Sequence, residues 1–306
     1  MSYGNGARAD LTSRRQDARE KAKAIREAQQ KQEKRTRRIV LTTVLLFTFA
    51  ILGIFALFLV NSIRPAGPGP LNMRSDGILI GEKFVATRTP SIQPGQTPIP
   101  TVRDESSDVI SIQLYVDYFC PLCQAFEKAN GDQISTWVNT GAATLEVHPI
   151  TLLDRLSQGS KYSSRAANAA ACVANFSPDS YFNFHSALFA NQPKENTSGL
   201  TNDELTALAI KAKSKNTTSI RSCIDDQTFK TWVADAKDRA LTGPIPYSNV
   251  DSVTGTPTVI VNGLAYTGQP NDAAAFSAFV VQAAGAKFNE NSTPTPTPTP
   301  SEAPAG

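Results

Sequence analysis

The longest apolar stretch of the chain runs from Ile39 to Val60 and holds 22 residues without a charged side chain. At about 1.5 Å per residue a helix of this length spans about 33 Å, enough to cross a hydrocarbon core of about 30 Å. A cleavable signal peptide has an apolar stretch of only about 7–15 residues, followed by a small-residue cleavage site. No clear site of that kind follows Val60, so the pattern predicts one transmembrane helix over 39–60.

Shorter apolar patterns predict strands. In Val109–Val116 apolar positions alternate and β-branched side chains are frequent, which is typical of a β-strand. Helical spacing follows this segment and continues to about Trp137. Gly77–Thr87 contains a similar apolar core and predicts an earlier strand of the same domain.

The segment 160–242 predicts consecutive helices. Thr201 and Glu204 have the spacing of a capping box, in which each side chain accepts a hydrogen bond from the other residue's backbone. Ser219–Leu241 predicts a further helix, with Phe229 and Trp232 at the spacing of core residues. We therefore expect this part of the chain to be helical.

Composition and the distribution of proline indicate which part of the chain forms a globular domain. With 41% hydrophobic and 19% charged residues the chain is neither mostly disordered, nor collagen-like, nor a multi-span membrane protein. Seven of the 20 prolines lie between residues 61 and 100, and five lie in the last 13 residues. These clusters predict a Pro/Gly linker over 61–75 and a disordered Thr/Pro-rich tail over 287–306. One domain remains, over 76–286.

Charge is distributed unevenly about the apolar run. Residues 1–38 carry a net charge of +7 and the rest of the chain −4, so the total of +3 gives no reason to expect a nucleic-acid partner. By the positive-inside rule, 1–38 is a basic cytoplasmic tail and everything after Val60 is exported. The tail is expected to be solvated or attracted to anionic lipid, and both can hold at once; the bilayer itself is the expected partner of 39–60.

The candidate chemistry lies at a strand-to-helix junction, in Cys120-Pro121-Leu122-Cys123. A helix N-terminus presents unpaired N–H groups and a partial positive charge, which stabilise a thiolate. Cys120 is therefore the expected nucleophile of thiol–disulfide exchange, and Cys123, one turn further into the helix, the expected resolving thiol. Pro121 fits the first helical turn, because its missing N–H would have no partner there.

Two other interpretations of this cysteine pair are weaker. A zinc site needs two further ligands, but His148 and His185 lie far apart and are expected to be structural, so no metal or cofactor is predicted. A purely structural disulfide would gain little, because the loop that it closes is very short. Redox chemistry is the favoured interpretation.

A family resemblance rests on these residues. Phe119–Cys123, with Phe126-Glu127 following, resembles the active site of the DsbA-like branch of the thioredoxin superfamily. Three further stretches resemble a central strand, a helix of the inserted helical domain and the cis-proline loop of that family, namely Leu145–Asp154, Tyr181–Pro193 and Gly255–Gly263. The resemblance covers about 200 residues. It implies an α/β, thioredoxin-like fold with an α-helical insertion over about 157–243, preceded by one transmembrane helix.

The resemblance also assigns roles to single residues. It implies that Pro257 is a cis-proline packed against Cys120 and Cys123, and that the Thr256 backbone pairs with an extended substrate; an ordinary trans-proline is the alternative. Leu122 stands where the strongest oxidants of the family carry histidine. We therefore expect Cys120 to be acidic, but less so than in those proteins, and the direction of electron flow stays open.

Four other residues complete the prediction. Asp117 is either a proton acceptor near Cys123 or a surface residue at the strand end, and Glu127 is expected to be exposed rather than a second acceptor. Once Cys120 and Cys123 are assigned to each other, Cys172 and Cys223 pair as a structural disulfide that closes about 52 residues and is worth roughly 4 kcal/mol. Two buried free thiols are the alternative.

These features together predict a membrane-anchored, extracytoplasmic thiol–disulfide oxidoreductase that introduces or exchanges disulfides in exported proteins. A reductase or isomerase with the same cysteines is the first alternative, and a non-catalytic folding module tethered to the membrane is the second. The resemblance implies exported substrate proteins with thiols, and a partner in a bacterial cell membrane that reoxidises the enzyme.

Overall fold

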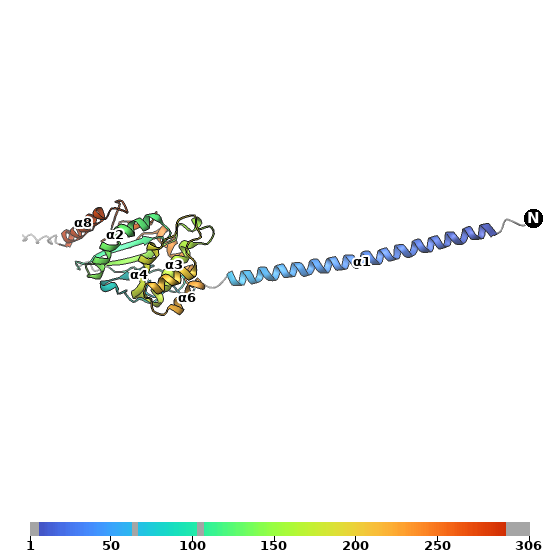
Figure 1. The fold of residues 1–306 in the computed structure, drawn as a ribbon, viewed down its shortest axis with the longest axis horizontal. Coiled ribbons are helices and arrows are strands. Elements are labelled where there is room, and N and C mark those ends of the chain that lie inside the picture. The colour runs from blue at the N-terminus through green and yellow to red at the C-terminus, as the bar shows by residue number, and fades with distance from the viewer. Residues whose placement is uncertain (1–5, 63–66, 103–106, 292–306) are drawn as a thin grey trace, which may run out of the picture. The chain divides into compact units, whose positions relative to one another are not determined.

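The computed structural model describes residues 6–62, 67–102 and 107–291, and the chain divides into two units, Met1–Pro65 and Ala66–Gly306. The first unit is helix α1, Gly6–Ser62, which runs without interruption for 57 residues (Figure 1). It joins the predicted basic tail and the predicted span in one helix. Most of the predicted C-terminal tail, residues 292–306, lies outside the described part of the chain.

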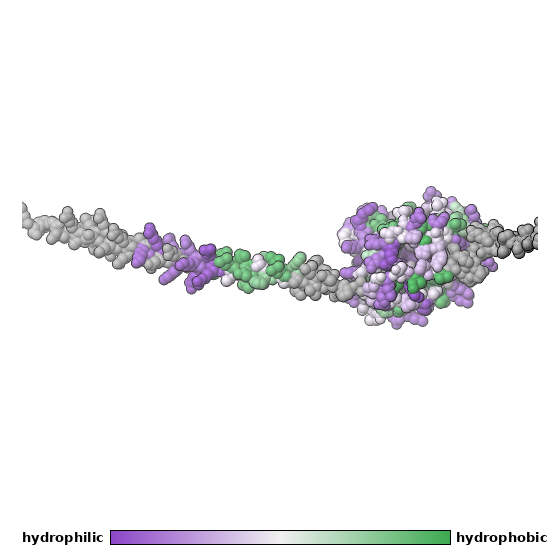
Figure 2. All heavy atoms as spheres, turned by 180° about the vertical axis from the view of Figure 1, so that it is seen from behind, coloured by the Kyte–Doolittle hydropathy of each residue, from purple (hydrophilic) through white to green (hydrophobic). Residues whose placement is uncertain are grey.

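Part of α1 is apolar enough to cross a membrane. The segment Lys31–Phe55 has a mean hydropathy of 2.2 and none of it is buried, so it is a candidate span by length and composition. Figure 2 shows its polar beginning giving way to a continuous apolar stretch. Hydroxyl groups on the span do not interrupt this surface, because they donate to carbonyls of the preceding turn, as Thr42 and Thr43 do to Ile39 at 2.9 and 2.8 Å.

The second unit is built on a five-stranded sheet in the order β1-β3-β2-β4-β5. Strands β2 and β3 are parallel, and all other pairs are antiparallel. The parallel pair requires a crossover, which helix α2 supplies. The bounds are β1 Ile78–Ile80, β2 Ile110–Val116, α2 Pro121–Asn139, β3 Ala143–Pro149, β4 Thr258–Val261 and β5 Leu264–Ala265.

Five helices are inserted between β3 and β4 and lie together beside the sheet (Figure 1). They are α3 Tyr162–Phe176, α4 Tyr181–Ala190, α5 Asn202–Lys211, α6 Thr217–Asp225 and α7 Lys230–Thr242. The predicted capping box is present at the start of α5, where Thr201 and Glu204 exchange both hydrogen bonds. A last helix, α8, covers Ala273–Asn291 and so continues past residue 286. The predicted thioredoxin-like fold with a helical insertion is confirmed.

One predicted helix is in fact two. Ser219–Leu241 was expected to be continuous, but α6 ends at Asp225 and α7 begins at Lys230. Gln227 has a φ of 50°, in the left-handed region, and the buried N–H of Phe229 donates to Asn168 Oδ1 at 2.8 Å instead of to a helical carbonyl. A side chain of α3 thus takes the donor that a continuous helix would use, and Phe229 remains buried all the same.

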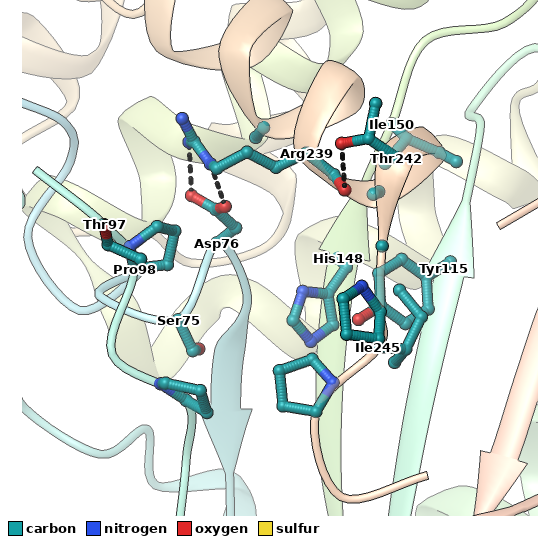
Figure 3. A pocket seen from close by; sticks show the side chains of 16 residues that line it. Ser75, Asp76, Thr97, Pro98, Tyr115, His148, Ile150, Arg239, Thr242 and Ile245 are labelled. Atoms are coloured by element: carbon teal, nitrogen blue, oxygen red, sulfur yellow. Dashed lines mark hydrogen bonds and ion pairs between the residues drawn. The ribbon is translucent and has the colours of Figure 1, made fainter. Parts of the chain in front are cut away.

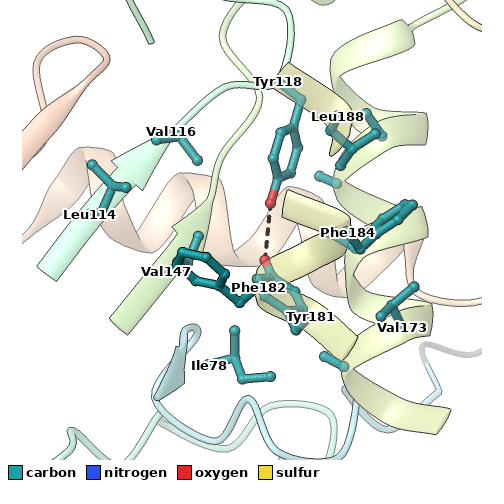
Figure 4. Packing of buried hydrophobic residues seen from close by; sticks show 14 of the residues in the cluster. Ile78, Leu114, Val116, Tyr118, Val147, Val173, Tyr181, Phe182, Phe184 and Leu188 are labelled. Carbon is teal, nitrogen blue, oxygen red and sulfur yellow. Dashed lines mark hydrogen bonds between the residues drawn. The ribbon is translucent and has the colours of Figure 1, made fainter. Parts of the chain in front are cut away.

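The main core lies between one face of the sheet and the helices. Leu114 and Val116 of β2 and Val147 of β3 face the buried aromatic side chains of α4, among them Tyr181 and Phe184 (Figure 4). Helices α2 and α8 join the same core, where the rings of Phe126 and Phe276 meet at 5.1 Å. The alternation of β2 determines this arrangement, because every second residue points to the same face.

The other face of the sheet carries a smaller core and a cavity of about 330 Å³. Tyr115 stacks on His148 at 4.3 Å, and Arg239 of α7 forms a two-bond ion pair with Asp76 at 2.6 and 2.7 Å (Figure 3). Ala240, near the end of α7, and Ile245 and Val253, between α7 and β4, supply much of the smaller core. The prediction of a linker as far as residue 75 is wrong at its end, because Met73 is fully buried in the main core and Gly69 N donates to Ile92 O at 2.8 Å.

Candidate active site

The two cysteines of the motif lie at the start of α2. Cys120 occupies the N-cap position with extended backbone, Pro121 is the first helical residue, and Cys123 lies inside the first turn. Both are thiols in this structure, and their side chains are largely covered, with 6% of Cys120 and 1% of Cys123 exposed. The strand β2 ends four residues earlier, so the short segment after it carries Cys120 directly onto the helix N-terminus.

The surroundings drive the two thiols apart in acidity. A hydrogen bond from the Cys123 thiol is the largest cause that lowers the pKa of Cys120, from 9.0 to about 6, and the N–H groups of Cys123 and Leu122 act in the same direction against burial. Burial, followed by the interactions with Cys120, raises the pKa of Cys123 well above 9.0. The arrangement suits a nucleophilic thiolate beside a protonated partner.

The Thr256–Pro257 peptide bond is cis, and its loop lies against the cysteines. Cys120 Sγ donates to Thr256 O at 3.3 Å, although 136 residues separate the two. The sheet explains the approach, because β2 and β4 are antiparallel and Tyr115 is paired with Thr258. The segment after β2 and the segment before β4 therefore meet at the same edge of the sheet.

Asp117 is fully buried, so the prediction of a surface residue at the strand end is wrong. Its carboxylate accepts the backbone N–H of Phe119 at 2.8 Å, and those of Leu152 and Leu153 at 2.7 and 3.0 Å. Burial is the largest influence on this group and raises its pKa against the effect of these bonds. Asp117 holds the loop after β2 to the loop after β3, and its role as proton acceptor stays a prediction.

Glu127 is also largely covered, with 11% of its side chain exposed, so the expected exposure is wrong. Its Oε2 lies 3.4 Å from Nε2 of His185, and Ser186 Oγ donates to Oε1 at 3.2 Å. Burial opposes ionisation, but His185 and these contacts outweigh it and lower the pKa of Glu127. His185 Nδ1 lies 3.1 Å from the hydroxyl of Tyr118, which places this histidine in a buried network.

Two glutamines that the sequence did not single out form hydrogen bonds near the start of α2, and of these only Gln192 binds the active-site loop with its side chain. Gln192, two residues beyond the end of α4, donates from Nε2 to the carbonyls of Tyr118 at 3.1 Å and Cys120 at 3.0 Å. Gln124 of α2 donates to Phe189 O at 2.9 Å. Gln192 lies in the Tyr181–Pro193 stretch that carries part of the family resemblance, and this resemblance is the only sequence feature named above that points to it.

Apart from Leu122, the remaining predicted residues lie away from Cys120. Cys172 of α3 and Cys223 of α6 form a disulfide within the insertion. His148 faces Glu146 on the opposite face of the sheet, with Nε2 and Oε2 3.7 Å apart. Leu122 is 57% exposed beside the cysteines. Among the residues that the structure describes, no three His, Cys, Asp or Glu side chains are grouped so that they could hold a metal ion.

Comparisons with known proteins agree with this geometry. Residues 104–282 match the family model described as thioredoxin, and no curated protein matches the chain. The reduced form of DsbG, a disulfide bond oxidoreductase from Mycobacterium tuberculosis, is 29% identical with a TM-score of 0.50, over 71% of this chain and 93% of that one. Oxidised DsbA from the same organism is also 29% identical with a TM-score of 0.50, over 72% and 100%.

Oxidised BdbD from Bacillus subtilis shares the fold at 19% identity, with a TM-score of 0.51 over 72% of this chain and 100% of that one. The family match extends over more than half of the chain. The chain therefore belongs to the thioredoxin family, as a DsbA-like thiol–disulfide oxidoreductase.

Proposed function

We propose that the protein is an extracytoplasmic, membrane-anchored oxidase of protein thiols, with Cys120 as nucleophile and Cys123 as its resolving partner. The opposite pKa shifts of these two thiols carry the proposal. A thiolate that is stabilised in the reduced enzyme is a good leaving group, and it favours transfer of the disulfide to a substrate.

In the oxidising reaction a substrate thiolate attacks Cys120 Sγ of the Cys120–Cys123 disulfide, and Cys123 leaves and takes up a proton. A second substrate thiolate then attacks the substrate sulfur of the mixed disulfide, and Cys120 leaves as a thiolate. Two electrons pass from the substrate to the enzyme. Of the two substrate protons, one remains on Cys123 and one is released, because the pKa of Cys120 is about 6.

Two features support a location outside the cytoplasm. Structural disulfides persist in oxidising compartments, and the insertion contains Cys172–Cys223. The exposed basic residues Lys34, Arg37 and Arg38 directly precede the apolar part of α1, an order that retains the N-terminus in the cytoplasm. In the proposed arrangement residues 1–38 are cytoplasmic, 39–60 span the bilayer, and 76–286 act on exported proteins.

Trapping tests the catalytic assignment. In a Cys123→Ala variant the Cys120 thiolate attacks a disulfide of an exported protein, one substrate sulfur leaves as a thiolate, and the mixed disulfide has no Cys123 to resolve it. We therefore expect exported proteins to stay covalently bound on Cys120 and to be released by reductant. The matched control is the variant with both cysteines replaced by alanine, which should hold none. Thiol oxidation that survived in a Cys120→Ser variant would contradict the assignment and would favour a non-catalytic module.

The reduction potential tests the direction of electron flow. A reduction potential of about −120 mV is typical of an oxidant, and one of about −270 mV is typical of a reductase. We expect a value on the oxidising side, and the lower value would favour a reductase or isomerase.

The membrane topology is tested separately. A membrane-impermeant maleimide applied to intact cells should label reduced Cys120, and protection of Cys120 until lysis would contradict the extracytoplasmic location.

A further inference from the structure

The helical insertion reaches the active-site loop through the side chain of Gln192. Its amide nitrogen bridges the carbonyl oxygens of Tyr118 and Cys120, at 3.1 and 3.0 Å. These carbonyls lie on either side of Phe119, in the segment that leads from β2 into α2. The exchange reaction described above makes no use of this contact.

We propose that Gln192 is a positioning residue of the active site. By holding the carbonyls of Tyr118 and Cys120, it fixes Cys120 Sγ over the first N–H groups of α2 and so controls the reactivity of the thiolate. The inference deepens the proposed function and rests on it only for the redox part of the test. Gln192 contacts neither sulfur, so it acts through the backbone of Cys120.

The peptide groups of this loop show why one amide can matter. The Cys120–Pro121 peptide has no N–H, so its carbonyl is its only hydrogen-bonding group. That carbonyl accepts Gln124 N from within the helix at 3.1 Å and Gln192 Nε2 from outside it. Two donors from different directions restrain the orientation of this peptide group, and the backbone orientation determines the position of the Cys120 Cβ atom.

The neighbouring peptide is held from two sides as well. Between Tyr118 and Phe119, the N–H is bound by Asp117 Oδ1 at 2.8 Å and the carbonyl by Gln192. One restraint comes from Asp117, directly after β2, and the other from the insertion. Removing Gln192 leaves the two loop carbonyls without their hydrogen bonds to the insertion, although the Tyr118 side chain still contacts α4. The backbone at Cys120 is then less restrained, and Cys120 Sγ can move away from the N–H groups of Leu122 and Cys123, which help lower its pKa.

The chain offers a matched control for this contact. Gln124 Nε2 also donates to a carbonyl across the contact between α2 and α4, that of Phe189 at 2.9 Å, but its side-chain amide holds neither of the two loop carbonyls. Gln124→Leu therefore removes a side-chain hydrogen bond of the same kind between the same two parts of the fold. A general loosening of the contact between α2 and α4 would affect both variants alike.

The test titrates Cys120 in the reduced full-length chain by thiolate absorbance and by the rate of alkylation with iodoacetamide. We expect Gln192→Leu to shift the titration to higher pH and to slow alkylation at pH 6 about fivefold, since a tenfold weaker acid would be about a tenth ionised instead of half. Gln124→Leu should keep the wild-type curve. Gln192→Met serves as a second variant, and thermal melting shows that each protein is folded.

The reduction potential, measured against glutathione, should move toward that of reductants in the Gln192 variants alone. A wild-type titration curve in both folded Gln192 variants, or an equal shift in Gln124→Leu, would overturn the positioning role. Titration needs no substrate, so its result is independent of whether the wild-type chain oxidises protein thiols. If the wild-type protein lacked that activity, the proposed function would fail while the effect of Gln192 on the thiolate could still be read.

Discussion

At the scale of single residues, the site depends on two identical side chains in different surroundings. Cys120 meets hydrogen-bond donors at the helix N-terminus, whereas Cys123 is buried within the first turn. The first environment stabilises a thiolate and the second a thiol. The difference in acidity therefore arises from position along one turn of helix, and it suits each cysteine to the separate role proposed for it.

The pKa of Cys120 leads to a prediction about pH. Alkylation of the reduced protein should follow the thiolate and rise about tenfold between pH 5 and pH 7, with a midpoint near pH 6. Because the folded pKa lies below the unfolded value of 9.0, the ionised thiol stabilises the reduced fold increasingly from pH 6 to 9, and this contribution is lost as the pH falls through 6. The melting temperatures of the reduced wild type and of Cys120→Ser, measured over this pH range, give the contribution. The same dependence of melting temperature on pH in both proteins would contradict it.

Asp117 gives a prediction about stability. Its carboxylate accepts three backbone N–H groups, so Asp117→Ala leaves buried donors without a partner and should cost about 2–4 kcal/mol of unfolding free energy. Asp117→Asn keeps one acceptor oxygen and should cost less. Denaturant unfolding of both variants checks the order, and wild-type stability of the alanine variant would show that these bonds contribute nothing.

At the scale of elements, the insertion is held together by contacts between helices that are distant in sequence. The disulfide joins α3 to α6 across 51 residues, and Asn168, one turn before Cys172, donates to the carbonyl of Cys223 at 3.4 Å and accepts the N–H of Phe229 at 2.8 Å. One asparagine thus helps set both the place of Cys223 and the break between α6 and α7.

Replacing both cysteines of this pair should destabilise the fold without changing the site. For a closed loop of this length the variant Cys172→Ala with Cys223→Ala is expected to lose roughly 4 kcal/mol of unfolding free energy. The alkylation rate of Cys120 should stay at the wild-type value below the melting temperature. A large change in that rate would show that the disulfide acts on the active site as well.

At the scale of the whole molecule, the chain consists of two units with different physical tasks. The first, α1, exposes an apolar surface that water does not stabilise, with Phe47 70% and Leu46 72% exposed. The second carries its own core and the whole candidate site. We therefore expect the chemistry to be separable from the predicted anchor.

A chain that begins at residue 67 should be soluble and folded, with the same Cys120 titration as the full chain. The full chain should remain with membranes after alkaline extraction, because its apolar helix needs a bilayer. Extraction and titration of the two forms give the comparison. A soluble full chain would contradict the predicted anchor, and an altered Cys120 titration in the short form would show that the first unit influences the site.

Prediction from the sequence succeeded where the signal is local. The alternation before Cys120, the helical spacing after it and the capping box at Thr201 all depend on neighbouring residues, and the structure has each of them. It failed where distant groups decide. The sequence around Asp117 gives no sign that Leu152 and Leu153 donate to its carboxylate, so a surface position stayed open. Glu127 was expected to be exposed because its partner, His185, lies on another helix.

The sequence alone was sufficient to locate the cysteine pair, the apolar run and the strand-to-helix junction at Cys120, because spacing and composition within short windows control these features. Only the tertiary structure decided which groups surround each cysteine. The antiparallel register of β2 and β4 brings Thr256 to Cys120, and the packing of α4 brings Gln192 to the loop. The pKa of a thiol depends on distances of a few ångströms between groups far apart in the chain, and folding alone sets those distances.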